Sequence, residues 1–239
     1  MTPVLLIGLW PSAPLVGIVL LVISHLLIVY ATLRPNVQWL GPVVTTFDTD
    51  RKELWLTIDD GPTPDTGSIL DLFDRLGVKA TFFVKGTLAE REAELVRMMI
   101  ARGHSVANHS HTHPSATFWC LPPTRIAKEI DRCNDILTHL TGERPRWFRA
   151  PVGMKNPGVH PVLRRRKMRL IGWSIRAFDG VRAEPERVLA RVAPHFHAGR
   201  ILVMHQGLPN SEETLENVIR EAQRRGYAFV IPQDSQLRA

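Results

Sequence analysis

The distribution of charge divides this chain into two unequal parts. The first 33 residues contain no Asp, Glu, Lys or Arg, and Arg34 is the first charged side chain. All other Lys and Arg residues, and all 23 Asp and Glu residues, lie beyond residue 40 of the 239. This pattern excludes a disordered chain, a collagen-like fibre and a multi-span membrane protein. It predicts a water-soluble domain that follows one apolar segment.

The apolar segment is long enough to cross a membrane. Residues 15–33 are almost entirely apolar, and about 20 helical residues span the hydrocarbon core of a bilayer. Pro14 can begin such a helix, and Arg34-Pro35-Asn36 can end it. We therefore expect a transmembrane anchor over residues 1–34, a linker over residues 35–52 and one folded domain over residues 53–239.

A cleaved signal peptide is the alternative interpretation of this segment. Val29-Tyr30-Ala31 resembles a small-residue cleavage site. However, the segment has no Lys or Arg before it and is long for the apolar part of a signal peptide, which favours an uncleaved, single-pass membrane anchor. Arg34, Arg51 and Lys52 follow the segment, and positive charge there favours a cytoplasmic domain. Three charges leave the membrane side of the domain undecided.

The rest of the chain alternates between short apolar runs and helical patterns. We expect strands over Leu54–Ile58, Lys79–Val84, His104–Ala107, Arg146–Arg149, Arg169–Ser174, Arg200–His205 and Tyr227–Ile231. We expect helices around Ile69–Leu76 and over residues 88–102, 124–141 and 211–225. This alternation predicts an α/β fold with a mainly parallel sheet, either open or closed into a barrel. In both forms, reactive residues gather at the carboxyl ends of the strands.

Two features of the composition narrow the function. Cys120 and Cys133 are too few for a disulfide framework or a Cys-rich zinc site. The basic run over residues 164–169 fits a solvated helix end, with anionic lipid or a phosphate-bearing substrate as the alternative. No motif for nucleic acid accompanies the charge, so we expect no nucleic-acid partner.

Polar side chains follow the predicted strands at the expected places. Asp59 and Asp60 follow the first strand, and His109 and His113 follow the third. The two histidines are four positions apart, so one helical turn would place both imidazoles on the same side. Two imidazoles and one carboxylate make a three-ligand metal site with an open position. Three further polar residues end later strands, namely Arg149, Asp179 and His205.

These residues resemble the motifs of the polysaccharide deacetylases with a NodB homology domain, carbohydrate esterase family 4. Four of the five family motifs are present in order, and the similarity covers roughly residues 50–235. They are Thr57–Gly61 for T-F-D-D-G, His109–Pro114 for H-[ST]-x-x-H-P, Arg149–Gly153 for R-x-P-x-G and Leu202–His205 for L-x-L-x-H. The resemblance implies a distorted (β/α)7 barrel, which agrees with the seven predicted strands.

The fourth motif, D-x-x-D-W, departs from the family pattern. Asp179 matches its second Asp, Arg176 replaces the first and Gly180 replaces the Trp. In the family, that Trp helps to form a wall of the sugar pocket. Its loss opens the wall, and Arg176 adds a cation that could meet a carboxylate, a phosphate or an acidic substrate.

The resemblance also implies a role for each matching residue. Asp60, His109 and His113 would bind one divalent metal ion, with Zn²⁺ favoured and Co²⁺, Ni²⁺ or Fe²⁺ also compatible. Asp59 would be the general base, held by Arg149, and His205 would be the general acid, supported by Asp179. The backbone N–H of Val152 would stabilise the oxyanion, and Arg176 is a further candidate for substrate contact.

The implied enzyme is a hydrolase of non-peptide carbon–nitrogen bonds. It would remove the N-acyl group, in most of the family an acetyl group, from an amino sugar in a carbohydrate or glycan. One alternative is deacylation or deformylation of a lipid-linked amino sugar of the cell envelope, which the anchor, the basic run and Arg176 favour. A second is a membrane-anchored carbohydrate-binding protein without activity, which the intact motifs disfavour. The expected partners are the N-acylated amino sugar and, through the N-terminal helix, membrane lipid.

Overall fold

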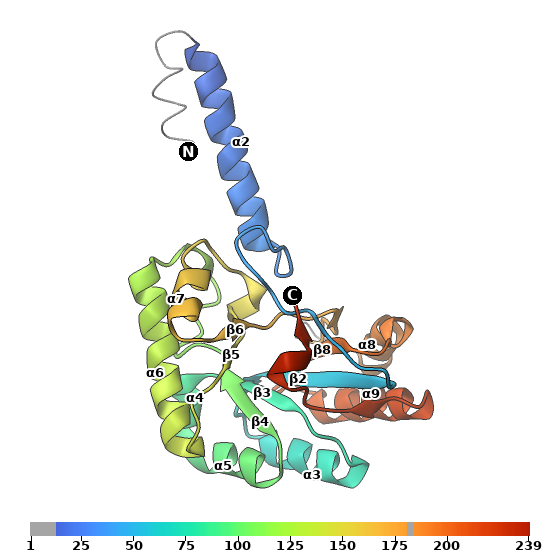
Figure 1. Ribbon diagram of the computed structural model, residues 1–239. Helices are drawn as coiled ribbons and strands as arrows, with labels where there is room; N and C mark the ends of the chain where they lie inside the picture. Colours follow the sequence, from blue (N-terminus) through green and yellow to red (C-terminus); the bar gives the residue numbers. More distant parts are fainter. Residues whose placement is uncertain (1–12, 181–183) are drawn as a thin grey trace.

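A computed structural model describes residues 13–180 and 184–239. It shows a curled sheet surrounded by helices, with one long helix, α2 (Pro14–Leu33), standing away from the rest (Figure 1). The strands are β1 (Thr46–Phe47), β2 (Glu53–Gly61), β3 (Thr81–Val84), β4 (Ser105–Asn108), β5 (Trp147–Phe148), β6 (Arg169–Leu170), β7 (Ile175–Arg176), β8 (Arg200–His205), β9 (Ala228–Phe229) and β10 (Leu237–Arg238). The other α-helices are α3 (Thr66–Leu76), α4 (Gly86–Arg91), α5 (Ala93–Ala101), α6 (Pro123–Thr141), α7 (Val159–Arg165), α8 (Pro185–Val192) and α9 (Ser211–Arg224). Short 3-10 turns are η1 (Phe118–Cys120), η2 (Pro151–Gly153), η3 (Ala193–His195) and η4 (Asp234–Gln236).

The sheet curls until its two sides meet. Its order is β10-β1-β8-β2-β3-β4-β5-β6, and the strands from β8 to β6 run parallel. A bridge between Val44 and Ile171 connects the segment before β1 to the segment after β6. There the N–H of Val44 donates to the carbonyl of Leu170 at 2.9 Å, and the N–H of Gly172 donates to the carbonyl of Val44 at 2.7 Å. This closure gives the distorted (β/α)7 barrel that the resemblance implies.

The predicted strands lie where we expected them, with one difference. The strand expected over Arg169–Ser174 ends at Leu170, and a separate strand, β7, begins at Ile175. The chain leaves the sheet between them because Gly172 bonds to Val44 and the N–H of Ser174 donates to the carbonyl of Ile201. The short strands β1 and β10, which we did not predict, pair with each other.

The segment expected to be a linker differs from that expectation from residue 43 onward. Val43, Val44 and Phe47 are buried, and β1 pairs with both β8 and β10. The N–H and C=O groups at the open side of the barrel need partners, and this segment supplies them. Residues 43–52 are therefore part of the barrel.

The predicted helices are present, and one of them is divided into two. The structure confirms α3, which ends at Gly77 in the left-handed conformation (φ 66°). The helix expected over residues 88–102 is divided at Glu92, whose φ of −116° and ψ of 46° lie outside the helical region, so that α4 and α5 form instead. Helices α6 and α9 begin and end within one residue of the predicted positions.

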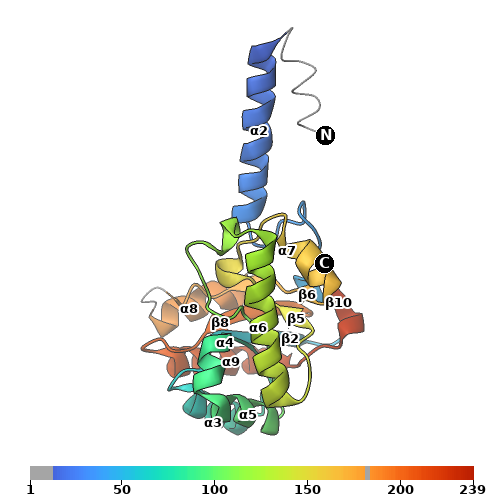
Figure 2. The same ribbon diagram turned by 90° about the vertical axis from the view of Figure 1, so that its left-hand side faces the viewer.

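Helix α2 projects from one end of the domain. The η2 turn and α7 lie at the same end, and α3 and α5 lie at the opposite end (Figures 1 and 2). The mean hydropathy of α2 reaches 2.5 over an 18-residue window of which 17% is buried. By length and composition this helix can cross a membrane, and a signal sequence would have the same properties.

Candidate active site

At the carboxyl end of β2, two consecutive carboxylates lie close to the same histidine. Side chains alternate between the two faces of a regular strand, which would separate Asp59 from Asp60. Here the register with β3 shifts between Asp59 and Gly61, and Asp60 has a left-handed φ of 76°. As a result both carboxylates approach the same imidazole nitrogen, Nε2 of His109, at 3.9 Å from Asp59 and 3.7 Å from Asp60. The irregularity at Asp60 thus builds the site.

His109 has a defined tautomer. Its Nδ1 lies 2.8 Å from the carbonyl oxygen of Arg149, which can only accept a hydrogen bond. Nδ1 therefore carries the proton, and the lone pair of Nε2 faces Asp60. The ring is almost fully buried (2% exposed), so this orientation is held by packing as well as by the hydrogen bond.

His113 also lies close to His109 and Asp60, although the segment that joins the two histidines is not helical. Residues 109–113 form a loop in which Ser110 and His113 have left-handed φ angles of 67° and 53°. The hydroxyl of Ser110 accepts the N–H of His113 at 3.1 Å. The two imidazole rings lie 4.6 Å apart between centroids, and Nε2 of His113 is 3.4 Å from Oδ1 of Asp60. The expectation of a helical turn is wrong, but the expected convergence of the two rings is found.

The protonation states of these three groups suit a divalent cation. Burial lowers the pKa of His109, and burial with repulsion from His109 lowers that of His113 to about 3. Burial works to raise the pKa of Asp60, but His109, Lys85 and His113 outweigh it and lower the value to about 2. At neutral pH the site therefore contains two neutral imidazoles and one carboxylate, the forms that bind a metal.

The geometry of the three ligand atoms also fits a metal ion. One nitrogen or oxygen from each of Asp60, His109 and His113 lies within 4.8 Å of the others. Oδ1 of Asp60 is buried and has no hydrogen-bond partner among the described residues. This oxygen and the unprotonated Nε2 of His109 face each other at 3.7 Å, an arrangement that a cation bound between them would stabilise.

Sequence reasoning missed Lys85. Its Nζ lies 2.8 Å from Oδ1 of Asp60 and forms an ion pair with it. Lys85 follows directly after β3, the neighbour of β2 in the sheet. The rule that reactive residues follow parallel strands would have identified it, had it been applied to the second strand as it was to the others.

Arg149 is a buried cation that holds Asp59. Its Nη1 donates to Oδ1 of Asp59 at 2.7 Å and to the hydroxyl of Thr57 at 2.8 Å. The remaining donors reach the carbonyls of Ile171 and Gly172, where the chain leaves the sheet. Because Arg149 is fully buried, its charge needs all of these partners.

His205 and Asp179 form a second pair on the other side of the site. His205 is the register partner of Asp59 on the neighbouring strand. Oδ1 of Asp179 lies 2.7 Å from Nδ1 of His205, and Oδ2 accepts the backbone N–H of His205 at 2.7 Å. Burial works to lower the pKa of His205, but the hydrogen bond and the charge of Asp179 raise it to about 9. His205 is thus protonated at neutral pH, with Nδ1 committed to Asp179.

Val152 has an unusual backbone conformation. Its φ is 57°, which is strained for a β-branched residue. Within residues 13–180 and 184–239, its N–H donates no hydrogen bond. The residue is 38% exposed, so this peptide lies at the surface of the domain rather than in the core.

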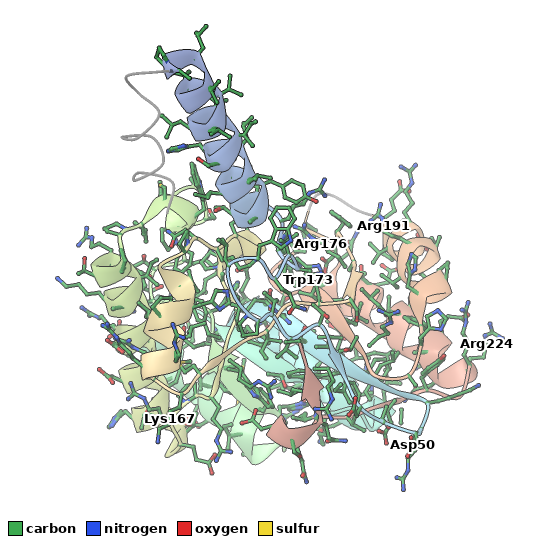
Figure 3. The ribbon with its side chains drawn as sticks, turned by 45° about the horizontal axis from the view of Figure 1, so that its top comes forward. Asp50, Lys167, Trp173, Arg176, Arg191 and Arg224 are labelled. Atoms are coloured by element: carbon green, nitrogen blue, oxygen red, sulfur yellow. The ribbon has the colours of Figure 1, made fainter. Side chains whose placement is uncertain are left out.

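Arg176 lies between two aromatic rings. Its guanidinium is 5.3 Å from the centroid of Trp173 and 4.5 Å from that of Phe178 (Figure 3). No ion pair involving Arg176 occurs among the described residues. Next to it, a Cβ on Gly180 would meet no atom of the described residues within 4 Å.

The other conspicuous histidine of the motif does not face the site. His111, the middle histidine of the motif, is buried (9% exposed) against Gly86 at the start of α4. Its backbone carbonyl accepts the N–H of Thr87. His111 therefore secures the loop onto α4.

The chain is similar to proteins of known activity over most of its length. Residues 46–171 match the profile of a family described as polysaccharide deacetylase. A chitooligosaccharide deacetylase from a Bradyrhizobium species is 32% identical over 184 residues, which cover 76% of this chain and 84% of that protein. A family 4 carbohydrate esterase from Streptomyces lividans, solved with acetate, is 26% identical with a TM-score of 0.72, covering 78% of this chain and 96% of that one.

A similar fold also occurs in a protein described as a pseudoenzyme of carbohydrate esterase family 4. That structure, from Bacillus anthracis, is 27% identical to this chain with a TM-score of 0.71 and covers 77% of this chain and 65% of its own. The fold therefore does not by itself establish catalysis, and the residues of the site must carry that argument.

Proposed function

This chain belongs to the polysaccharide deacetylase family, hydrolases of carbon–nitrogen bonds in N-acetylated sugars, and on that premise we propose that it is a metal-dependent N-deacylase of amino sugars. The observation that carries the metal dependence is the convergence of the buried Oδ1 of Asp60 with the Nε2 atoms of His109 and His113, of which that of His109 carries no proton. Asp60, His109 and His113 would hold the ion, and Zn²⁺ fits this ligand set best. When bound, such an ion acts as a Lewis acid on the amide carbonyl and on water.

The proton transfers fall to the two pairs that flank these ligands. In our proposal Asp59 is the general base that takes a proton from the attacking water, and Arg149 keeps its carboxylate in position. His205 is the general acid that gives a proton to the departing amine. The hydrogen bond with Asp179 supports this role, because it keeps His205 protonated until that step.

The oxyanion needs a donor, and the N–H of Val152 is a candidate. It has no partner among the described residues, and the left-handed conformation of Val152 fixes the direction of this peptide plane. A backbone donor fixed in advance stabilises developing charge without reorganisation. Strain at such a position is common in active sites.

We further propose that residues 1–34 are a retained membrane anchor and that the catalytic domain extends to residue 239. The hydropathy and length of α2 support the anchor. The burial of Val43, Val44 and Phe47 supports a domain that begins near residue 43, earlier than the boundary expected at residue 53. The membrane side of the domain is left open in this proposal.

Two observations favour a lipid-linked amino sugar as the second candidate substrate. Arg176 is a cation without an ion pair among the described residues, and Gly180 leaves the adjacent wall open. A phosphate beside the sugar would pair with Arg176, and a long substituent could leave through the open wall. An N-acetylated glycan such as a chitooligosaccharide remains the first candidate, as in the Bradyrhizobium relative.

A substrate panel separates these candidates. The purified full chain is offered chitooligosaccharide, a peptidoglycan fragment, and N-acetyl and N-formyl amino sugars on a polyprenyl phosphate, and released acetate or formate is measured. Faster release from the soluble sugars would support the first candidate, and faster release from the lipid-linked sugars would support the second. No release from any substrate, with metal present, would contradict the enzyme and favour a carbohydrate-binding protein.

The pH dependence tests the role of Asp179. The raised pKa of His205 predicts that kcat falls on the alkaline side with an apparent pKa near 9. In Asp179→Asn this value should drop below the ordinary histidine value of about 6.5, which reduces kcat at pH 8 by about thirtyfold. Because the folded protein binds the proton of His205 more tightly than the unfolded chain does, this proton stabilises the fold. The stabilisation is fully present below about pH 6.5 and is lost as pH rises through 9. The control is exposed Asp50→Asn, and an unchanged profile in Asp179→Asn would exclude His205 as the acid.

A further inference from the structure

Lys155 is a fully buried cation at the end of the long helix. Its Nζ donates to the carbonyls of Arg34 and Pro35, both at 2.8 Å, and lies 3.5 Å from the carbonyl of Ala31. Its backbone N–H donates to the carbonyl of Thr32. No carboxylate pairs with Lys155 in the described part of the chain. Burial lowers its pKa to about 8, which still leaves it protonated at neutral pH.

The carbonyls of Ala31 and Thr32 belong to the last turn of α2, whose carbonyls lack partners within the helix and form the negative end of its dipole, and those of Arg34 and Pro35 follow directly after it. An ammonium group at this position satisfies them as a C-terminal cap. The partners of a buried charge cannot be removed without a large cost, so the contact joins two elements firmly. Ala31 and Thr32 are themselves buried against the domain. The candidate cleavage site over residues 29–31 thus adjoins a packed interface.

The same junction reaches residues beside the candidate active site. Lys155 follows two residues after Gly153, the last residue of the η2 turn that contains Val152. Pro35 packs so closely on Gly153 that a Cβ there would lie 2.8 Å from the proline side chain. Asn36 donates to the carbonyl of Trp173 at 2.7 Å, and the ring of Trp173 lies beside Arg176 (Figure 3). The segment after α2 therefore contacts both the η2 turn, which contains Val152, and Trp173, which packs beside Arg176.

The surface at this end of the domain suits a lipid interface. Tyr30 and Trp39 stack with their centroids 5.4 Å apart, Arg34 lies over the Tyr30 ring, and Trp39 is 63% exposed. Amphipathic aromatic and basic side chains are typical of the headgroup region. An apolar groove of about 400 Å³ separates α2 from the domain, and Ile28, Val29, Trp119 and Leu121 contribute to its lining. Phe178, beside Arg176, is 54% exposed.

We propose that Lys155 joins α2 rigidly to the η2 turn, so that the catalytic cleft is held in a fixed orientation at the surface of a lipid bilayer. This inference rests on the part of the proposed function that makes α2 a membrane anchor. It implies that the natural substrate is an amino sugar carried on, or lying against, the membrane. A flexible tether would instead let the domain sample substrates away from the surface.

Spin-label distances test the rigidity. The full chain with Cys120→Ser is placed in nanodiscs of phosphatidylethanolamine and phosphatidylglycerol, with nitroxides at Leu20→Cys on α2 and Lys128→Cys on α6. We expect one narrow distance distribution, which becomes at least twice as broad in Lys155→Met and stays narrow in the matched exposed variant Lys167→Met. A broad distribution in the parent protein, or a narrow one in folded Lys155→Met, would overturn the proposal.

Membrane depth provides a test that needs no substitution of Lys155. A nitroxide at Phe178→Cys should be shielded from a water-soluble relaxation agent at least threefold more than one at Arg97→Cys on α5, at the opposite end of the domain. Equal accessibility would contradict the proposed orientation. Release of acetate or formate by the same nanodiscs, offered both chitooligosaccharide and N-acyl amino sugars on a polyprenyl phosphate, tests catalysis separately. A shielded, rigid but inactive protein would refute the proposed function and leave the junction supported.

Discussion

Asp60→Asn is expected to abolish metal binding and deacetylation together. The amide keeps the size of the side chain and tolerates the left-handed φ of 76° that Asp60 adopts, so the backbone should not change. It removes the negative charge that two neutral imidazoles need as a third ligand. We expect metal affinity to fall by at least about a hundredfold and acetate release by about a thousandfold. Metal content after dialysis and acetate release are the two measurements.

The matched control for this substitution is Asp135→Asn on α6. It removes the same charge from a side chain that is 71% exposed, and it should leave both quantities unchanged. Asp60→Asn with full metal content would place the metal elsewhere. Asp60→Asn with normal acetate release would contradict a role for this carboxylate in catalysis.

Asp59→Asn is expected to have two large effects with separate causes. Arg149 and Asp59 form an ion pair at 2.7 Å with side chains that are 1% and 5% exposed. Neutralising Asp59 leaves the buried guanidinium without its counter-charge, which should lower the free energy of unfolding by about 3–5 kcal/mol. Loss of the general base should reduce kcat by about 10²–10⁴-fold. Thermal unfolding and acetate release measure the two effects independently.

A double variant distinguishes the structural effect from the catalytic one. In Asp59→Asn with Arg149→Met, both charges are gone and an apolar side chain can pack against Phe83, whose ring lies 4.1 Å from the Arg149 guanidinium. Stability should recover by most of the loss, since replacing both partners of a buried pair is often tolerated. Activity should not recover. If activity returned with stability, Asp59 would be a structural residue and another group would have to act as base.

The location of the site could be predicted from the sequence because apolar runs mark where the strands end. Asp59, His109, Arg149 and His205 each follow or end an apolar run, and parallel strands bring such ends to one edge of a sheet. The structure places these side chains around one centre. The local geometry could not be predicted in the same way. The convergence of His109 and His113 depends on left-handed residues in a loop, and no periodic pattern encodes that conformation.

The errors at the edge of the barrel have a common physical origin. Val43, Val44 and Phe47 lie between a membrane-like segment and the first long strand, where a linker is the simplest interpretation. Their burial follows from unpaired backbone groups near Ile171 and β8, which lie far away in the sequence. Lys155 was invisible for a related reason, because its partners are backbone carbonyls more than a hundred residues away. Sequence patterns report which side chains are apolar, but they do not report which distant carbonyl needs a donor.

The resemblance to a pseudoenzyme makes catalysis the central claim to test. The most direct measurement is acetate released from chitooligosaccharide by the purified full chain, first stripped of metal with a chelator and then given one equivalent of Zn²⁺. We predict no release from the stripped protein, restored release once zinc is added, and no release from Asp60→Asn with or without zinc. Release that is unaffected by the chelator, or no release from any N-acyl amino sugar after zinc is restored, would contradict a metal-dependent deacylase.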